Sequence, residues 1–233
     1  MDTNPNIHSQ LLEKVREYHM PQAARDLLAA HPPLVIAGIT ASGKSSATSY
    51  ITDTTQYRQV VSHTTRRPRS DEANGTDYYY VSDEAMLEMV NNRAMVEVQT
   101  ILGDTVYGIS LGAYQDVVNS GYKALLSIDV QGVKEISKYL PDLRPVFLLP
   151  PSFERWMEML EKRGRMSHSE RLKRMHSARG ELEKALASER FHLVVNQDIP
   201  KTAREILGGI RDQSEQHRNR ETANILLDRL KTI

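Results

Sequence analysis

A short loop near the start of the chain has the residue types and the spacing that bind nucleotide phosphates. It satisfies the pattern G-x-x-x-x-G-K-[ST] in the run Gly38-Ile39-Thr40-Ala41-Ser42-Gly43-Lys44-Ser45. The apolar run 33–37 before it suits a buried parallel strand, and residues 44–51 after it can open a helix. Inward-turned backbone N–H groups and a helix N-terminus together attract anions. This context favours a phosphate-binding loop (P-loop) over an ordinary glycine turn.

The last residues of the P-loop have separate predicted roles. Lys44 reaches the β- and γ-phosphates of a nucleotide, and the Ser45 hydroxyl is a ligand of Mg²⁺. ATP is therefore the predicted co-substrate and Mg²⁺ the predicted cofactor. The loop residues predicted to bind ATP are Gly38, Ile39, Thr40, Ala41, Ser42, Gly43, Lys44, Ser45 and Ser46.

A second polar segment gathers arginines directly after the next predicted strand, residues 59–62. Arg66, Arg67 and Arg69 stand within four positions of one another, and each guanidinium group can hold phosphate oxygens bidentately. We expect this strand to neighbour the P-loop strand and to end beside the P-loop, where α/β folds bind ligands. That position favours a phosphate site, although a solvated basic turn is the alternative.

A third group of arginines lies in residues 163–174. Arg163, Arg165, Arg171 and Arg174 stand in a segment that begins without apolar periodicity. Arginine can neutralise the charge that spreads over the oxygens of a transferring phosphoryl group, since it stays protonated. For Arg165 and Arg171 a solvated basic face is an equally good interpretation.

Asp129 ends an apolar run, a position where the carboxylates that organise Mg²⁺ in P-loop enzymes often stand. It could equally be the N-cap of a helix that starts at Val130. Both interpretations remain open on the residues alone.

The arginine segment resembles the substrate segment of the guanylate kinase family, S-x-T-T-R-x-P-R-x-x-E-x-x-G-x-D-Y, which residues 62–78 match. The resemblance covers residues 33–212 in one consistent order. It continues through Tyr107-Gly108 and the runs 128–132, 148–152, 162–164 and 195–198. The family comprises P-loop kinases of nucleoside monophosphates (NMP).

The resemblance implies a role for individual residues. Arg66, Arg69, Tyr78 and Tyr107 would hold the phosphate of GMP, while Ser62 and Glu97 would read the guanine edge. Arg163 would belong to a lid over ATP, and Asn196 would lie near the adenine. The predicted catalytic residues are Lys44, Arg66, Arg163 and Arg174, and the predicted substrate-binding residues are Ser62, Arg66, Arg69, Tyr78, Glu97, Tyr107 and Asp129.

Alternating strand and helix patterns must position these residues, and they predict an α/β fold with a parallel sheet covered by helices on both faces. By resemblance the P-loop domain spans residues 33–212, with an inserted small NMP-binding subdomain at about 67–115 and a lid at about 163–174. Residues 1–32 form a helical extension, and residues 213–233 a helical tail. The extension could pack on the domain's own surface, mediate self-association or bind a partner. Because it holds no chemistry-bearing residue, its removal is expected to leave the catalytic constants within a few-fold.

Composition limits the classes of protein to consider. The 233 residues include 30 Lys and Arg and 30 Asp and Glu, so no net charge favours binding to nucleic acid or to a membrane surface. Cysteine is absent, which excludes disulfides and thiol nucleophiles. No apolar run approaches membrane-spanning length, and the N-terminus lacks the features of a signal peptide. A cytoplasmic protein, monomeric or homodimeric, is the expectation.

The predicted activity is the ATP-dependent phosphorylation of GMP or dGMP by direct in-line transfer. The alternatives are a kinase of the same fold for another phosphorylated small molecule and a non-catalytic module that binds phosphoproteins. The chain departs from the family pattern at Ala41, Ile109 and Ser127, where the family usually has glycine, a hydroxyl residue and an acid. Ala41 is tolerable there if its φ stays negative. One additional residue separates Glu97 from Tyr107.

Overall fold

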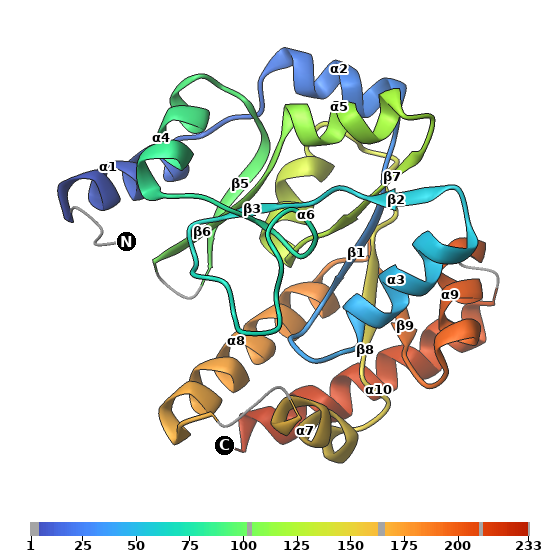
Figure 1. The fold of residues 1–233 in the computed structure, drawn as a ribbon. Coiled ribbons are helices and arrows are strands. Elements are labelled where there is room, and N and C mark those ends of the chain that lie inside the picture. Colours follow the sequence, from blue (N-terminus) through green and yellow to red (C-terminus); the bar gives the residue numbers. More distant parts are fainter. Residues whose placement is uncertain (1–4, 102–103, 163–165, 210–211, 233) are drawn as a thin grey trace. The chain divides into compact units, whose positions relative to one another are not determined.

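The computed structural model describes residues 5–101, 104–162, 166–209 and 212–232 (Figure 1). The chain forms two compact units. Unit 1 comprises Met1–Pro33, Arg58–Ala124 and Lys134–Pro141, and unit 2 comprises Leu34–Tyr57, Leu125–Val133 and Asp142–Ile233. Over the described residues, no helix combines the length and the apolar character that crossing a membrane requires.

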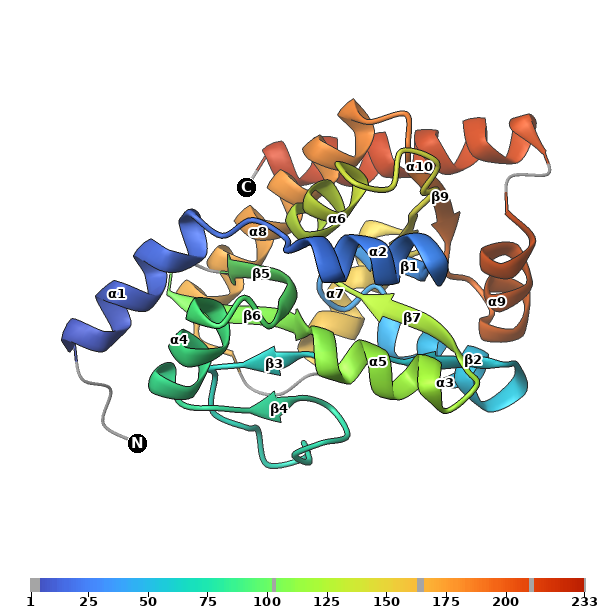
Figure 2. The same cartoon turned by 90° about the horizontal axis from the view of Figure 1, so that it is seen from above.

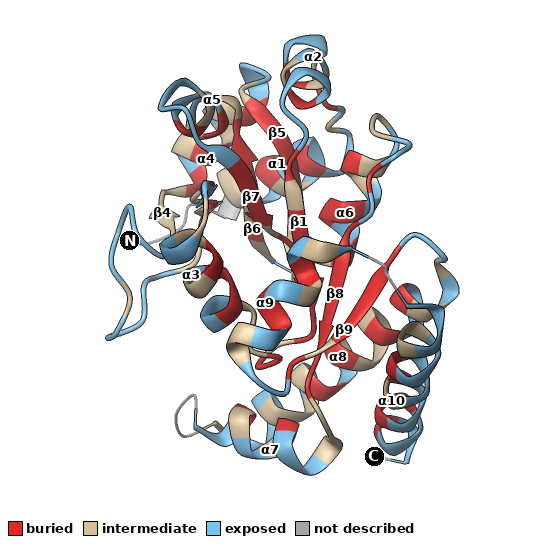
Figure 3. Cartoon of the chain, turned by 90° about the vertical axis from the view of Figure 1, so that its right-hand side faces the viewer, coloured by how far each residue is buried: buried red, intermediate tan, exposed pale blue. Residues whose placement is uncertain are grey.

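A five-stranded sheet carries the P-loop. Its strands are β1 (Leu34–Gly38), β2 (Tyr57–Gln59), β7 (Lys123–Ser127), β8 (Val146–Leu149) and β9 (His192–Val195), in the order β2-β7-β1-β8-β9. β1 pairs in parallel with β7 and β8, and β8 pairs in parallel with β9. Apolar runs bury these central strands (Figure 3), as a parallel sheet between helices requires. The prediction of an α/β fold with a parallel sheet flanked by helices is confirmed.

One prediction about this sheet is wrong. The strand expected at residues 59–62 ends at Gln59 and does not neighbour the P-loop strand, because β7 lies between β1 and β2. β7 carries the buried run 124–126, which needs a strand on each side, whereas β2 is the polar sequence Tyr-Arg-Gln and suits a sheet edge.

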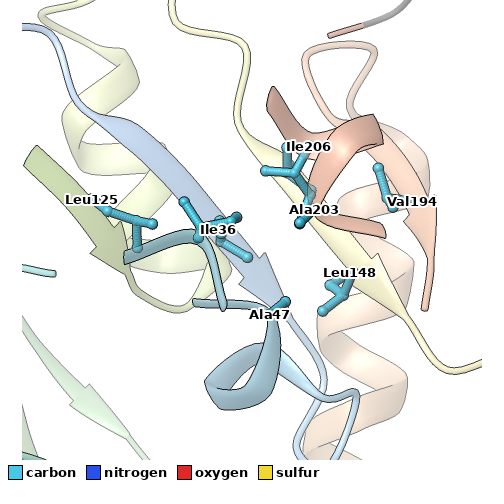
Figure 4. Close-up of a cluster of buried hydrophobic side chains, with 9 residues drawn as sticks. Ile36, Ala47, Leu125, Leu148, Val194, Ala203 and Ile206 are labelled. Atoms are coloured by element: carbon cyan, nitrogen blue, oxygen red, sulfur yellow. The ribbon is translucent and has the colours of Figure 1, made fainter. Parts of the chain in front are cut away.

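Helices surround the sheet of unit 2. They are α3 (Lys44–Thr54), α7 (Phe153–Glu161), α8 (His168–Ala187), α9 (Ile199–Gly208) and α10 (Gln213–Lys231), and α6 (Val130–Ser137) begins within the unit. A cluster of buried side chains joins α3 and α9 to β1, β7, β8 and β9 (Figure 4). N-cap side chains fix where α7, α8 and α9 begin: Ser152, Ser167 and Asp198 each accept a hydrogen bond from a backbone N–H of the first turn.

Unit 1 contains a second, four-stranded sheet with the order β4-β3-β6-β5. Its strands are β3 (His63–Thr64), β4 (Tyr79–Tyr80), β5 (Met95–Ile101) and β6 (Thr105–Ser110). β6 pairs antiparallel with both β3 and β5, and β3 pairs in parallel with β4. The helices of this unit are α1 (Pro5–Arg16), α2 (Gln22–Ala30), α4 (Asp83–Asn91) and α5 (Leu111–Asn119). Ser82 is the N-cap of α4, since its side chain accepts a hydrogen bond from the Ala85 N–H.

The two faces of this small sheet have different neighbours. Val98 and Val106 belong to an apolar cluster with side chains of α1 and α4, so one face is covered by these helices. Residues directly opposite each other in a ladder share a face and successive residues alternate. The pairings Glu97–Ile109 and Thr64–Tyr107 therefore place these four residues on the other face.

Candidate functional site

The P-loop depends on three residues with positive φ: Gly38 at 147°, Ala41 at 58° and Gly43 at 90°. A Cβ atom on Gly38 would lie 2.4 Å from the Leu148 carbonyl oxygen, and one on Gly43 would lie 1.9 Å from the Asn196 side-chain nitrogen. Both glycines are therefore required by close packing as well as by conformation. The condition under which alanine would be tolerated at position 41, a negative φ, is not met, because the loop turns through the left-handed region at this residue.

Three side chains from other elements hold the P-loop in shape. Trp156 Nε1 on α7 donates to the Thr40 carbonyl at 2.8 Å, and Asn196 Nδ2 after β9 donates to the Ser42 carbonyl at 2.9 Å. Arg174 Nη1 on α8 donates to the Thr40 hydroxyl at 3.4 Å. Arg174, predicted from the sequence, thus lies at the loop. Asn196 also lies there, where its amide supports the backbone.

Lys44 is the first residue of α3, and its ammonium group lies within the loop. Its Nζ donates to the carbonyls of Gly38 and Ile39. A phosphate bound in the loop could take over these donors, because an anion is a better partner for ammonium than a neutral carbonyl. Ser45 and Ser46 follow in the first turn of α3 with exposed side chains, so their hydroxyls are accessible to a ligand.

Two half-buried acids belong to the electrostatic surroundings of Lys44. Burial raises the pKa of Asp129, while hydrogen bonds from the Gly132 and Gln131 amides and the charge of Lys44 oppose the shift. Asp129 Oδ1 accepts from the Gly132 N–H at 2.7 Å, which is the geometry of the helix cap considered for it. Burial likewise raises the pKa of Glu181, and Lys44 again opposes the shift.

Glu181 was not predicted from the sequence, although a signal for it exists. It lies on the stripe of α8 that contains the buried residues Ala178, Leu182 and Ala185. An acid on an apolar stripe is unusual, since a buried charge needs a partner. Ser177 Oγ on the same helix donates to Glu181 Oε1 at 3.1 Å.

In unit 1 the arginine segment forms a compact polar cluster around one carboxylate. Arg66 donates to both oxygens of Glu72, at 2.8 and 2.9 Å, and its Nε donates to the Tyr107 hydroxyl at 3.1 Å. Glu72 also accepts from the Tyr80 hydroxyl and from the Arg69 backbone N–H, each at 2.8 Å. Only 20% of the Arg66 side chain and 11% of the Glu72 side chain are exposed, so water screens this pair weakly.

The pKa values in this cluster follow from these contacts. Burial alone would raise the pKa of Glu72, but hydrogen bonds from Arg66, the Arg69 amide and Tyr80 lower it to about 2. The pKa of Arg66 is raised, since its bond to Glu72 outweighs the opposing effect of burial. Burial and the bond to Glu72 raise the pKa of Tyr80 to about 12. The cluster is therefore an ion pair over the whole physiological pH range.

Aromatic rings complete the cluster. The Arg66 guanidinium lies 5.3 Å from the centre of the Tyr78 ring and 5.6 Å from that of Tyr80. Tyr78 meets Tyr107 edge to face at 5.7 Å, and burial raises the pKa of the Tyr78 hydroxyl. The predicted phosphate-binding residues Arg66, Arg69, Tyr78 and Tyr107 are thus gathered in one place. Glu72 and Tyr80 join them without having been assigned a role.

The two residues predicted to read a base are buried in the same unit. Ser62 is 8% exposed and Glu97 6% exposed. Glu97 lies on the sheet face that also carries Tyr107. The ladder is regular from Glu97 to Ile101 against Thr105 to Ile109.

Of the predicted lid arginines, Arg163 and Arg165 fall outside the described residues. Arg171 is surface-exposed in α8 and pairs with Glu161 at 3.1 Å. The ion pair of Arg171 agrees with the alternative that this arginine belongs to a solvated basic face. Arg174, in contrast, contacts the P-loop.

Comparison with known proteins finds guanylate kinases among the proteins to which this chain is similar. A family model described as guanylate kinase matches residues 30–213. A guanylate kinase of Leifsonia xyli subsp. xyli is 35% identical over 177 residues, which cover 75% of this chain and 68% of that protein. One of Tropheryma whipplei (strain Twist) is 35% identical over 173 residues, covering 74% and 89%. The crystal structure of guanylate kinase from Anaplasma phagocytophilum shares the fold, with a TM-score of 0.58, 24% identity and coverage of 79% and 90%.

Proposed function

The chain belongs to the guanylate kinase family, and on that premise we propose that it transfers the γ-phosphoryl group of ATP to GMP or dGMP, giving ADP and GDP or dGDP. The observation that supports this most is that the chain has two separate groups of residues suited to bind phosphate, the P-loop in unit 2 and the Arg66 cluster in unit 1. A direct in-line transfer between two bound phosphates needs one such arrangement for each.

On the donor side, the loop residues from Gly38 to Ser46 would surround the ATP phosphates with backbone N–H groups. Lys44 would exchange the Gly38 and Ile39 carbonyls for phosphate oxygens, and Arg174, already at Thr40, would neutralise charge that develops during transfer. Arg163, in the proposed lid, would add to this neutralisation. Asn196 would act at the ATP site by holding Ser42 in place.

The residues at the start of α3 fit a bound Mg²⁺. Ser45 offers an exposed hydroxyl in the first helical turn, and Mg²⁺ is commonly held by few protein ligands together with phosphate oxygens and water. We therefore assign Ser45 as its protein ligand. The ion would supply positive charge between the β- and γ-phosphates.

On the acceptor side, Arg66, Arg69, Tyr78 and Tyr107 would hold the GMP phosphate, and Asp129 is kept as a substrate-binding residue. Ser62 and Glu97 would read the base, because a carboxylate accepts from the N1–H and amino group of guanine but not from the edge of adenine. Ile109 offers no hydrogen bond where the family has a hydroxyl residue. We expect GMP to be the best acceptor, with a raised KM.

The remaining sequence expectations are part of the same proposal. Residues 67–115 would be the NMP-binding subdomain of a domain spanning 33–212, and residues 163–174 the lid. The reaction would take place in the cytoplasm, in a monomer or a homodimer. Light scattering after size-exclusion chromatography distinguishes the two assemblies.

A panel of GMP, dGMP, AMP, CMP and UMP with ATP and Mg²⁺, followed by ADP release, tests the activity. GMP or dGMP should give the highest kcat/KM, and Lys44→Ala should lower turnover by at least about 10²-fold. Lys201→Ala is the matched control, because Lys201 is exposed and pairs with Glu205. The proposal fails if AMP, CMP or UMP outperforms GMP, or if Lys44→Ala keeps wild-type turnover.

A further inference from the structure

The N-terminal extension contacts the edge of the sheet that carries Glu97. β5 is the last strand in the order β4-β3-β6-β5, and an edge strand presents backbone groups that lack a neighbouring strand. The Tyr18 hydroxyl donates to the Met95 carbonyl at 2.7 Å and accepts from the Met95 N–H at 3.1 Å. One side chain thus takes the place of a strand partner at this residue. Burial raises the pKa of Tyr18, so the hydroxyl keeps the proton that it donates.

Met95 stands immediately before an irregularity that decides where Glu97 faces. Met95 pairs with Ser110 and Glu97 with Ile109, so β5 has one residue more than β6 over this step. In a regular strand residues 95 and 97 would share a face. The bulge instead sends Met95 into the apolar cluster with α1 and α4, while Glu97 lies on the opposite face with Tyr107.

The position of this bulge is therefore a condition for the use of Glu97 as a base-reading acid. A shift of one residue in register would turn the carboxylate toward the apolar cluster. The Tyr18 hydroxyl binds both backbone groups of the residue next to the bulge. These two bonds hold the backbone at the point where a change of register would begin.

The rest of the extension keeps Tyr18 in place. Leu11 and Val15 on α1 are buried in the same cluster as Met95, and α1 packs on α4 and β5 (Figures 1 and 2). His8 Nδ1 lies 2.8 Å from the buried carboxylate of Asp83 at the start of α4. Leu11 and Val15 thus belong to the core of unit 1, although the family model begins only at residue 30.

We propose that Tyr18 is a positioning residue for the acceptor base, acting through the bulge at Met95 and Val96 on the carboxylate of Glu97. The inference rests on the proposed function, because it concerns how guanine is bound. It also changes one expectation drawn from the sequence. Removal of the extension should weaken the use of GMP much more than a few-fold, even though the extension carries no residue that touches substrate.

Tyr18→Phe is the direct test, since it removes only the hydroxyl. The expected result is a KM for GMP that rises by about 5-fold or more with the KM for ATP unchanged. The preference for GMP over IMP should fall by a similar factor, because IMP lacks the 2-amino group that a correctly placed Glu97 would bind. Tyr139→Phe is the matched control: its hydroxyl also accepts a bond within unit 1, from Arg25, but does not touch β5.

The outcomes separate this inference from the proposed function. A wild-type protein that does not phosphorylate GMP overturns the proposed function itself. If the wild type uses GMP but Tyr18→Phe leaves both the KM for GMP and the GMP/IMP preference unchanged, the inference is wrong. A loss shared equally by GMP, IMP and ATP would show that Tyr18 only supports folding, which also overturns it.

A measurement on the wild type covers the case in which Tyr18→Phe does not fold. Amide hydrogen exchange of residues 94–98 should slow when GMP binds and should not respond to ATP, because Glu97 would then couple the bulge to the acceptor. If GMP does not change the amide exchange rates of residues 94–98, the inference is wrong, and this result needs no variant protein.

Discussion

The two proposed phosphate sites of this protein, the P-loop and the Arg66 cluster, are built in opposite ways. The P-loop is made of backbone, and its shape is held by Trp156, Asn196 and Arg174 through bonds to Thr40 and Ser42. The Arg66 cluster of unit 1 is made of side chains, and its charge is already neutralised by a carboxylate of the same segment.

This difference separates two kinds of preorganisation. The P-loop presents backbone donors whose positions are fixed by the conformation of the loop. It is therefore most sensitive to substitutions that change backbone conformation or close packing, as at Gly38, Gly43 and Ala41. The Arg66 cluster keeps its guanidinium group oriented by pairing it with Glu72, so an incoming phosphate must share or replace that carboxylate. Changes in unit 1 should therefore act through charge and pH, and changes in the loop through geometry.

The largest effect that distinguishes the two arrangements is expected for Arg66→Ala. This change removes the guanidinium group that is proposed to hold the acceptor phosphate, and it leaves the Glu72 carboxylate weakly screened and without its main partner. At about 1.5–3 kcal/mol for a bond to a charged group, kcat/KM for GMP should fall by roughly 10- to 150-fold, with ATP affinity unchanged.

Arg67→Ala is the matched control for this prediction, because Arg67 lies in the same segment with an exposed side chain. It should change kcat/KM for GMP by less than about 2-fold. Calorimetry with each nucleotide measures the binding directly. If Arg66→Ala weakens the binding of ATP as much as that of GMP, the Arg66 cluster does not serve the acceptor specifically, and the distinction drawn between the two sites is wrong.

The parts of this contrast that could be predicted from the sequence are local ones. The P-loop pattern and the arginine segment each lie within a short run, so residue types and spacing alone reveal them. The order of β2 and β7 was missed, although the polar sequence of β2 and the apolar run of β7 agree with an edge and an inner position.

Contacts between distant residues set the rest of the site. Tyr18 and Met95 are 77 positions apart, and no periodicity in either segment indicates their bond. The sequence showed only that Glu72 matches the acidic position of the family pattern. Its pairing with Arg66 depends on how the turn folds back and could not be predicted. The positive φ of Ala41 is likewise a property of the folded loop.

Acids of the two units should give opposite dependences of stability on pH. The pKa of Glu72 is lowered from its ordinary 4.5 to about 2, so its contribution to folding is present above about pH 4.5 and is lost as the pH falls toward 2. Burial raises the pKa of Glu181, so the cost of its charge is present above its folded pKa and is relieved as the pH falls through that value.

Glu72→Gln and Glu181→Gln test this as a matched pair. In urea titrations at a series of pH values, Glu72→Gln should lower the unfolding free energy at pH 7 by about 1–3 kcal/mol, and the deficit should shrink below about pH 4.5. Glu181→Gln should cost less at neutral pH than at acid pH, since it removes a buried charge. If the loss of unfolding free energy relative to wild type is independent of pH in Glu72→Gln and in Glu181→Gln, the predicted opposite pH dependences of the two acids are wrong.

The smallest effect is expected for Ala41→Gly, which probes the geometry of the P-loop without touching its charges. Ala41 holds φ at 58°, a conformation that costs an L-residue roughly 1–2 kcal/mol and costs glycine almost nothing. Part of that gain is offset, because glycine loses more backbone entropy on folding and because the buried methyl group of Ala41 is lost. We expect the unfolding free energy to rise by about 0.5–1 kcal/mol, with the KM for ATP within about 2-fold of wild type. Ala47→Gly, in the interior of α3, is the control of opposite sign, since helical glycine destabilises and a buried methyl group is lost. If Ala41→Gly destabilised the protein as Ala47→Gly does, the left-handed turn at Ala41 would not be a feature of the folded loop.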